Sequence, residues 1–282
     1  MKTLFLFLAS LAFALPASAD DPIKCPPGVT GGLSANWGKN FREHVTDVFI
    51  EAKTVAGVTQ NVQLIDWNDL PIKAAGDRTV QGSPISALPK GTLGLTSDAV
   101  VYAFGVFEIA CDEPQLATFM LHEMRHLLVV DGKNHFDRVL ACRKAMVNEW
   151  VKTADLSAFP DTPEGTKAAM AKFDADKGSD YQKTCVLPVE NEADKFAFDK
   201  MPNMHYKIDP VSDPNRDARS QAFKNAEAWA VAINEKPCDD GHGCLGDRAK
   251  AGAAAAAAQM DQQRKARERI LGMSIQPGTN GY

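Results

Sequence analysis

The sequence lacks the features that mark nucleic-acid-binding and membrane-spanning proteins. It has no run of basic residues, and its formal net charge at pH 7 is −5. Because affinity for nucleic acid depends on basic side chains that neutralise phosphates, we expect no nucleic-acid partner. After the first 19 residues, no apolar run reaches the roughly 20 residues that a membrane span needs, so we expect no membrane partner. The sequence also has no Asn-x-Ser/Thr sequon, and N-glycosylation is not predicted.

The chain also lacks internal repeats and any Pro/Ser-rich linker, so one main domain is expected. The first 19 residues carry a Lys at position 2, a short apolar run and an Ala-Ser-Ala ending, a pattern typical of a secretory signal peptide. We therefore predict a secreted, extracellular protein with a signal peptide at 1–19 and a main domain at 20–246. An Ala/Gln/Arg-rich helical tail is expected at 247–282, and we assign no chemistry to it because it has little apolar surface to bury.

All six cysteines lie after the predicted signal peptide. An even number of cysteines in an exported chain favours disulfides, and six cysteines allow fifteen pairings. Only Cys238 with Cys244 can be paired from sequence, because the turn-forming residues of CDDGHGC lie between them. The same loop contains Asp239, Asp240 and His242, so a second metal site is the alternative to a loop closed only by a disulfide.

Hydrophobic periodicity predicts a helix-rich α+β fold. Apolar residues at helical spacing indicate a helix over 37–55, and β-branched and aromatic residues predict a strand over 99–111. A second helix is expected directly after this strand, with Asp112 as its N-cap, Pro114 in its first turn and no breaker before Leu128. Further helical patterns occur at 138–152, 166–174 and 220–234.

The helix after Asp112 carries the sequence His122-Glu123-Met124-Arg125-His126, which is an H-E-x-x-H motif. Residues at i and i+4 lie on one face of a helix, so the two imidazoles can bind one metal ion. Glu123 lies about 100° around the helix from His122 and can act on a water molecule instead of the metal. The alternative is a helix whose histidines are merely solvated or packed.

A catalytic zinc ion usually has three protein ligands. The candidates for the third ligand are Asp131, His135 and Asp137, which follow the motif. Asp131 is better explained as a turn former before Gly132. His135 is the favoured ligand because Gly132 would end the helix and let the chain reverse toward the metal. Asp137 remains the alternative, since a carboxylate serves equally well on chemical grounds.

Four segments of this chain resemble the aspzincins, which are secreted fungal metalloendopeptidases that include deuterolysin. FEIAC at 107–111 and LHEMRH at 121–126 are similar to the family's strand, cysteine and zinc helix. NAEAWAVA at 225–232 resembles its late helix, and FREHVTDVFIEAKTVA at 41–56 resembles its opening helix. The family's third ligand is an Asp in a Gly/Thr-containing turn beyond the second His. Here the Gly-Thr is missing, position 135 is His, and the Asp is at 137.

The resemblance implies a zincin-like metallopeptidase domain with a small sheet above the HExxH helix. We accordingly predict a secreted zinc-dependent endopeptidase that binds one Zn²⁺ through His122, His126 and His135 and uses Glu123 as general base. Its partner would be a polypeptide substrate, which the strand over 99–111 could bind as an additional strand, and the protein is expected to be a monomer.

Two questions remain open from sequence alone. The residue that stabilises the substrate carbonyl oxygen is unassigned among Arg138, Tyr181, His205 and Tyr206. The alternative function is a secreted, antigen-like protein that binds or scavenges zinc with weak or no proteolysis.

Overall fold

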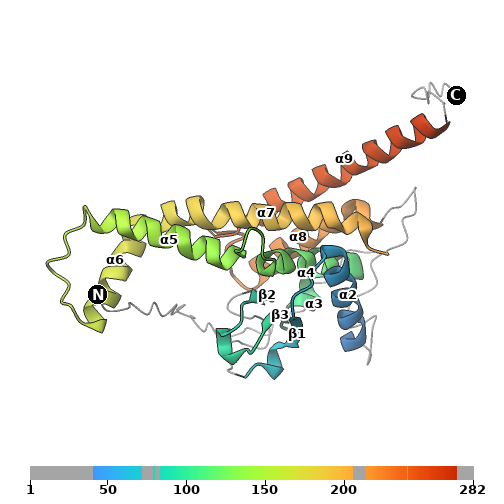
Figure 1. Ribbon diagram of the computed structural model, residues 1–282. Helices are drawn as coiled ribbons and strands as arrows, with labels where there is room; N and C mark the ends of the chain where they lie inside the picture. Colours follow the sequence, from blue (N-terminus) through green and yellow to red (C-terminus); the bar gives the residue numbers. More distant parts are fainter. Residues whose placement is uncertain (1–40, 72–78, 80–82, 206–213, 240, 272–282) are drawn as a thin grey trace.

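The computed structural model describes residues 41–71, 79, 83–205, 214–239 and 241–271 (Figure 1). The predicted signal peptide at 1–19 and the last residues of the predicted tail lie outside the described residues. Helices dominate and a small sheet accompanies them, which confirms the helix-rich α+β class. Within the described residues, no helix combines the length and the apolarity that crossing a bilayer requires.

Helix α2 (Phe41–Ala56) is the early helix that the periodicity predicts. It buries one apolar face, which includes Val45, Val48 and Ala52, and this face packs against helix α4. The helix ends before Gly57, which adopts a left-handed conformation with φ of 72°. Glycine is favoured there because it has no Cβ to clash in that conformation.

The main sheet has three short strands, β1 (Val62–Asp66), β2 (Ile85–Leu88) and β3 (Asp98–Tyr102). Their order is β1-β3-β2, with β1 parallel and β2 antiparallel to β3. Single 3₁₀ turns, η2 (Trp67–Asp69) and η3 (Thr92–Gly94), lie between the strands in the chain. Strand β3 is therefore central and paired on both sides, whereas β2 lies at an edge of the sheet as described.

The strand predicted over 99–111 is only partly correct. Strand β3 ends at Tyr102, and the rest of the apolar run forms a short helix, α3 (Val106–Ile109). The residues of α3 are all buried, and a fully buried segment shows no period that separates a strand from a helix. Because β3 is central, it cannot accept a substrate as an additional strand, and that prediction was wrong.

Helix α4 (Glu113–Leu127) begins as predicted. The Asp112 carboxylate accepts a hydrogen bond of 2.8 Å from the backbone N–H of Gln115, and Pro114 occupies the first turn. An Asp at this position satisfies a backbone donor that has no partner within the helix. The helix packs against α2, α7 and α8, and nearly all its side chains are buried. It is therefore an interior helix, and His122 and His126 are not solvated surface groups.

After α4 the chain is helical except for a short hairpin, and α7 and α8 pack against α4 (Figure 1). Helices α5 and α6 extend away from the sheet, and α9 projects beyond α8 toward the C-terminus. A π-helical turn, η4, joins α6 to α7, and a two-stranded hairpin of β4 and β5 precedes α9. The bounds are α5 (His135–Val151), α6 (Pro163–Tyr181), η4 (Gln182–Val186), α7 (Leu187–Lys200), η5 (Met201–Asn203), α8 (Pro214–Ala232), β4 (Cys238–Asp239), β5 (Gly243–Cys244) and α9 (Leu245–Leu271).

Two disulfides lie within the described residues. Cys238 bonds to Cys244 and closes the β4–β5 hairpin, as predicted. Cys142 bonds to Cys185 and ties α5 to η4. Cys111 is disulfide-bonded as well. Cross-links of this kind persist in oxidising compartments, so they are compatible with an exported protein.

Candidate metal centre

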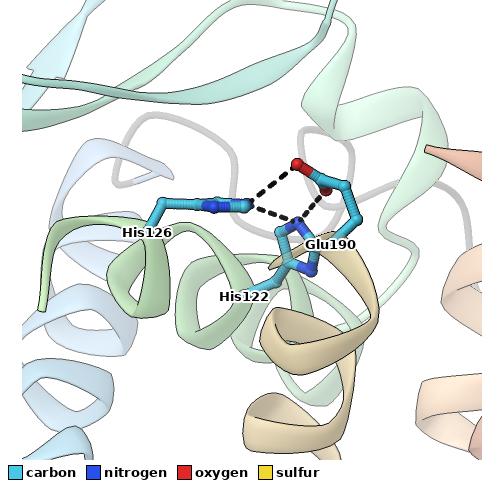
Figure 2. Close-up of side chains that lie close together, drawn as sticks. All are labelled: His122, His126 and Glu190. Carbon is cyan, nitrogen blue, oxygen red and sulfur yellow. Dashed lines mark hydrogen bonds and ion pairs between the residues drawn. The ribbon is translucent and has the colours of Figure 1, made fainter. Parts of the chain in front are cut away.

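Helices α4 and α7 bring three potential metal ligands together (Figure 2). His122 and His126 project from one face of α4, and Glu190 projects toward them from the first turn of α7. The Nε2 atoms of the two histidines are 3.0 Å apart. Glu190 Oε2 lies 3.2 Å from His122 Nε2, and Glu190 Oε1 lies 3.5 Å from His126 Nε2. All three side chains are buried.

The donor atoms and their spacing fit a zinc-type cation. Tetrahedral zinc with bonds of about 2.0–2.2 Å holds neighbouring ligand atoms about 3.3–3.5 Å apart. The three distances of 3.0, 3.2 and 3.5 Å between the nitrogens and the oxygens are close to that spacing. Three protein ligands of His₂Glu type are also the number and kind found at catalytic zinc sites, whereas structural sites usually have four.

The surroundings of His122 favour positive charge. Burial acts to lower the pKa of His122, but hydrogen bonds to Asp194 and Glu190 outweigh it and raise the pKa to about 10. Burial likewise acts to raise the pKa of Glu190, yet hydrogen bonds with His122 and His126 hold that pKa well below its usual range. A proton or a metal ion at His122 Nε2 thus offsets the negative charge of the buried carboxylates. The proton and the metal ion compete for this nitrogen.

Asp194 holds the other nitrogen of His122. Its Oδ1 lies 2.8 Å from His122 Nδ1, and Arg248 donates to both Asp194 oxygens, each at 2.7 Å. Burial acts to raise the pKa of Asp194, but the Arg248 guanidinium beside it holds the pKa at about 2. Asp194 follows Glu190 by one helical turn, so α7 supplies both a potential ligand and the group that orients another. Carboxylates in this position fix the orientation of metal-binding imidazoles.

Arg248 comes from the segment to which the sequence assigned no chemistry. Helix α9 begins at Leu245, and its first turns pack against α7 and α8 with Ala249 and Ala256 buried. Alanine is small enough to let two helices approach closely, so the Ala-rich composition serves packing here. The start of the tail therefore belongs to the structure around the candidate metal centre.

Glu123 follows His122 in the motif but is not a member of the ligand group. It is half-buried, and its Oε2 accepts a hydrogen bond of 2.6 Å from the backbone N–H of Ala87 in strand β2. Ala87 pairs with Val100 of β3, and its N–H points to the other side, the outer edge of the sheet. The Glu123 carboxylate thus connects helix α4 to the edge strand β2.

The sequence predicted His135 as the third ligand. In the structure, His135 is not a member of the ligand group. His135 is buried at the start of α5, and its Nδ1 lies 3.0 Å from His126 Nδ1, on the opposite side of that ring from Nε2. Burial, with His126 and Arg125 nearby, lowers the pKa of His135 to about 3. A tight turn closed by Val130 and Lys133 lies between the end of α4 and Asn134, and His135 contacts His126 at Nδ1 and not at Nε2.

The other two candidate ligands also have different roles. Asp137 is exposed and forms a capping box with Asn134: the Asn134 side chain accepts from the Asp137 N–H at 2.9 Å, and the Asp137 carboxylate accepts from the Asn134 N–H. Such reciprocal bonds stabilise a helix N-terminus. Asp131 adopts a φ of 53° in the tight turn closed by Val130 and Lys133, as expected for a turn former.

Glu190 was missed by the sequence analysis. A signal for it exists in LPVENEADKFAF at 187–198, where two acidic residues four positions apart interrupt an otherwise apolar helical face. Acidic residues are rarely buried unless they are paired or bind a metal. A search for buried carboxylates on later helices would therefore have found Glu190 and Asp194.

Comparison with known proteins gives no relative from which a function could be inferred. No protein-family model, curated protein or solved structure matches the chain. The likeness to the aspzincins thus remains a hypothesis that rests on four short segments. One of them, at 225–232 in α8, does contact the segment at 107–111: Asn225 Nδ2 donates to Cys111 Sγ at 3.2 Å, and Trp229 Nε1 donates to Glu108 at 2.7 Å.

Four residues were candidates for the group that stabilises the substrate carbonyl oxygen. Three of them have other contacts: Arg138 pairs with Glu192 at 2.7 Å, the Tyr181 ring lies under the Arg143 guanidinium, and His205 lies 3.0 Å from Glu51. Tyr206 lies outside the described residues.

His242, on the disulfide-closed hairpin, is closer to the ligand group than the sequence suggested. Its Nε2 lies 4.0 Å from Glu190 Oε2, and its Nδ1 lies 3.1 Å from Asp239 Oδ2. The side chain is 53% exposed, so it borders the buried ligands and solvent. Asp240, the third member of the alternative metal site in this loop, lies outside the described residues. The geometry of His242 and Asp239 is that of an imidazole oriented by a carboxylate.

Proposed function

We propose that this protein is a secreted zinc-dependent endopeptidase with His122, His126 and Glu190 as metal ligands and Glu123 as general base. The proposal is carried by one observation: three buried ligand atoms converge from α4 and α7 while Glu123, from the same motif, stays outside their group beside an edge strand. The disulfides are compatible with export. A small sheet beside an HExxH helix supports a zincin-type arrangement, with a glutamate in place of the aspartate that the resemblance to the aspzincins implies.

Bound zinc would lower the pKa of water and polarise a carbonyl group. Glu123 supplies the proton transfers. Its carboxylate takes a proton as a water oxygen adds to the peptide carbonyl carbon, and it then delivers that proton to the amide nitrogen. The C–N bond breaks, and the products are a carboxylate and an amine. The hydrogen bond from Ala87 leaves the second Glu123 oxygen available for this role.

His242 is the group that we assign to the carbonyl oxygen. Asp239 lies beside the Nδ1 atom of His242 and therefore favours a proton on that nitrogen. When the ring is charged, Nε2 carries a proton as well. The charged ring presents an Nε2–H donor near Glu190 Oε2. A fixed donor directed at an oxygen that gains negative charge lowers the barrier to acyl transfer.

Strand β2 is the part of the sheet that we assign to substrate binding. Among the described strands, none pairs with its outer edge, where Glu123 accepts its hydrogen bond. An extended peptide can add to such an edge through backbone hydrogen bonds, which suits a polypeptide substrate. This assignment replaces the central strand β3 that the sequence favoured.

Zinc sequestration without proteolysis is the second candidate function. It is favoured by the depth of the ligands, since His122 is only 4% and His126 and Glu190 are only 7% exposed. It is also favoured by the hydrogen bond that ties Glu123 to Ala87. A protein that only stores zinc needs a tight site and no accessible general base.

Metal removal tests the proposed function. The purified full chain is expected to contain about one zinc ion and to cleave an unfolded, reduced and alkylated polypeptide, because a His₂Glu site with a general base has the parts for hydrolysis. Dialysis against a strong chelator should abolish cleavage, and equimolar zinc should restore it. Zinc at one ion per chain with no cleavage would favour sequestration, and the absence of zinc from a folded protein would contradict both functions.

The role of His242 is tested by its replacement with alanine. His242→Ala is expected to lower kcat by about 100-fold, the usual cost of losing one donor to the carbonyl oxygen, with zinc content unchanged. His205→Ala is the matched control, because His205 is an exposed histidine paired with Glu51 and should leave kcat unchanged. Equal kcat values for both variants would remove His242 from the reaction.

A further inference from the structure

We propose that His135 is a positioning residue that fixes the metal-binding orientation of His126 through a chain of contacts to Glu192. This inference rests on the proposed metal site but not on peptidase activity. The contacts run from His126 Nδ1 to His135 Nδ1 at 3.0 Å, and from His135 Nε2 to Glu192 Oε2 at 3.6 Å. We call these three side chains the His126–His135–Glu192 relay.

The directions of the protons in the relay follow from metal binding. An imidazole that ligates through Nε2 must carry its proton on Nδ1, so His126 Nδ1–H is the donor toward His135. His135 Nδ1 is then the acceptor, and the proton of the neutral ring lies on its Nε2. That N–H faces the Glu192 carboxylate across 3.6 Å, which is beyond a direct hydrogen bond, so the contact is electrostatic.

Glu192 is held in place by two arginines. Arg125, which is buried in α4, and Arg138, in α5, both donate to its carboxylate, Arg138 at 2.7 Å. The relay therefore joins α4, α5 and α7. His126 Nδ1 therefore contacts His135, whereas His122 Nδ1 contacts Asp194, which is paired with Arg248.

Burial of His135 is not explained by apolar packing alone. The side chain is 2% exposed, and its Nε2 has no hydrogen-bond partner. An unpaired buried nitrogen costs free energy, which an apolar side chain at the same place would avoid. An imidazole at this position is explained if His135 Nδ1 accepts a hydrogen bond from His126. The two rings are also in contact, with their centroids 5.0 Å apart.

Zinc affinity of three His135 variants tests the relay. Asparagine places its side-chain oxygen near the position of Nδ1, glutamine places it near Nε2, and leucine has similar bulk without an acceptor. We expect His135→Leu and His135→Gln to weaken zinc binding by about 10- to 100-fold, the usual effect of losing a group that orients a ligand, and His135→Asn to restore most of the affinity. Affinity is measured on metal-free full-length protein by competition with a chromophoric chelator.

The comparison between asparagine and glutamine separates positioning from stability. Both are polar amides, and the melting temperatures of the metal-free variants report any difference in folding, including that from their different helix propensities. Equal affinities of His135→Asn and His135→Gln would overturn the relay, as would wild-type affinity in His135→Leu, while leaving the metal site intact. Absence of zinc binding by the wild-type protein would overturn the metal site and the relay together. Glu149→Gln, on the exposed face of α5, is the control and should bind zinc like the wild type.

Discussion

Replacement of Glu190 by glutamine is expected to lower the affinity for zinc by about 100-fold or more and to abolish peptide hydrolysis at equimolar zinc. Structural zinc sites, which have four protein ligands, bind the ion with apparent free energies of about 10–16 kcal/mol, so a single ligand contributes roughly 3 kcal/mol. Glu190→Gln keeps the volume of the side chain between His122 and His126 but removes its negative charge. A neutral amide oxygen is a weak zinc ligand, and two histidines alone do not hold the ion.

Asp137→Asn is the control for this variant, because Asp137 is the alternative third ligand by sequence and an N-terminal capping residue in the structure. It should bind zinc with wild-type affinity and lose only a little helix stability. Chelator competition and metal analysis of the dialysed proteins measure both variants. Unchanged affinity in Glu190→Gln combined with a loss in Asp137→Asn would return the third ligand to the segment after the motif.

The parts of the site that sequence predicts are those set by local geometry. Asp112, Pro114 and the absence of breakers define α4, and the spacing of His122 and His126 places both rings on one face. The cap spans four residues and the histidine spacing spans five, and both follow from the period of a helix. The disulfide between Cys238 and Cys244 was predicted for the same reason, because a short polar turn brings the two ends together.

The third ligand is not local, and sequence does not determine it. Glu190 reaches the histidines because α7 packs across α4, and that packing depends on where α5, α6 and the Cys142–Cys185 disulfide return the chain. Nothing near His126 encodes this path. His135 was favoured because it is close in sequence and has the right chemistry. The structure uses that proximity differently, since the ring contacts the back of His126.

Arg248 shows the same limitation at the other end of the chain. Composition indicates a solvated helix for its segment, and most of α9 is indeed exposed. Its first turns nevertheless lie on α7 and α8, and one largely buried guanidinium there neutralises Asp194 behind His122. Burying a charge costs free energy unless an opposite charge lies beside it. The burial of Arg248 therefore depends on Asp194 in the assembled site and cannot be predicted from the sequence of its own segment.

Glu123→Gln is expected to lower the rate of peptide hydrolysis by about 10²- to 10⁴-fold while zinc remains bound at wild-type affinity. The amide cannot take the proton of the attacking water, and general base catalysis contributes an acceleration of this size. Zinc should remain because Glu123 lies outside the ligand group. Glutamine also keeps an oxygen that can accept the hydrogen bond from Ala87, so the contact between α4 and β2 is preserved.

Initial rates on an unfolded polypeptide and zinc content of the same sample are the measurements. Glu113→Gln, at the start of the same helix and paired with His44 at the surface, is the control and should cleave like the wild type. Because the variant differs from the wild type only in the ability of residue 123 to move a proton, retained hydrolysis would remove Glu123 from the reaction. Absence of cleavage by wild type, control and variant alike, with zinc bound in all three, would leave sequestration as the function. In that case the Ala87 hydrogen bond marks Glu123 as a structural contact between helix and sheet.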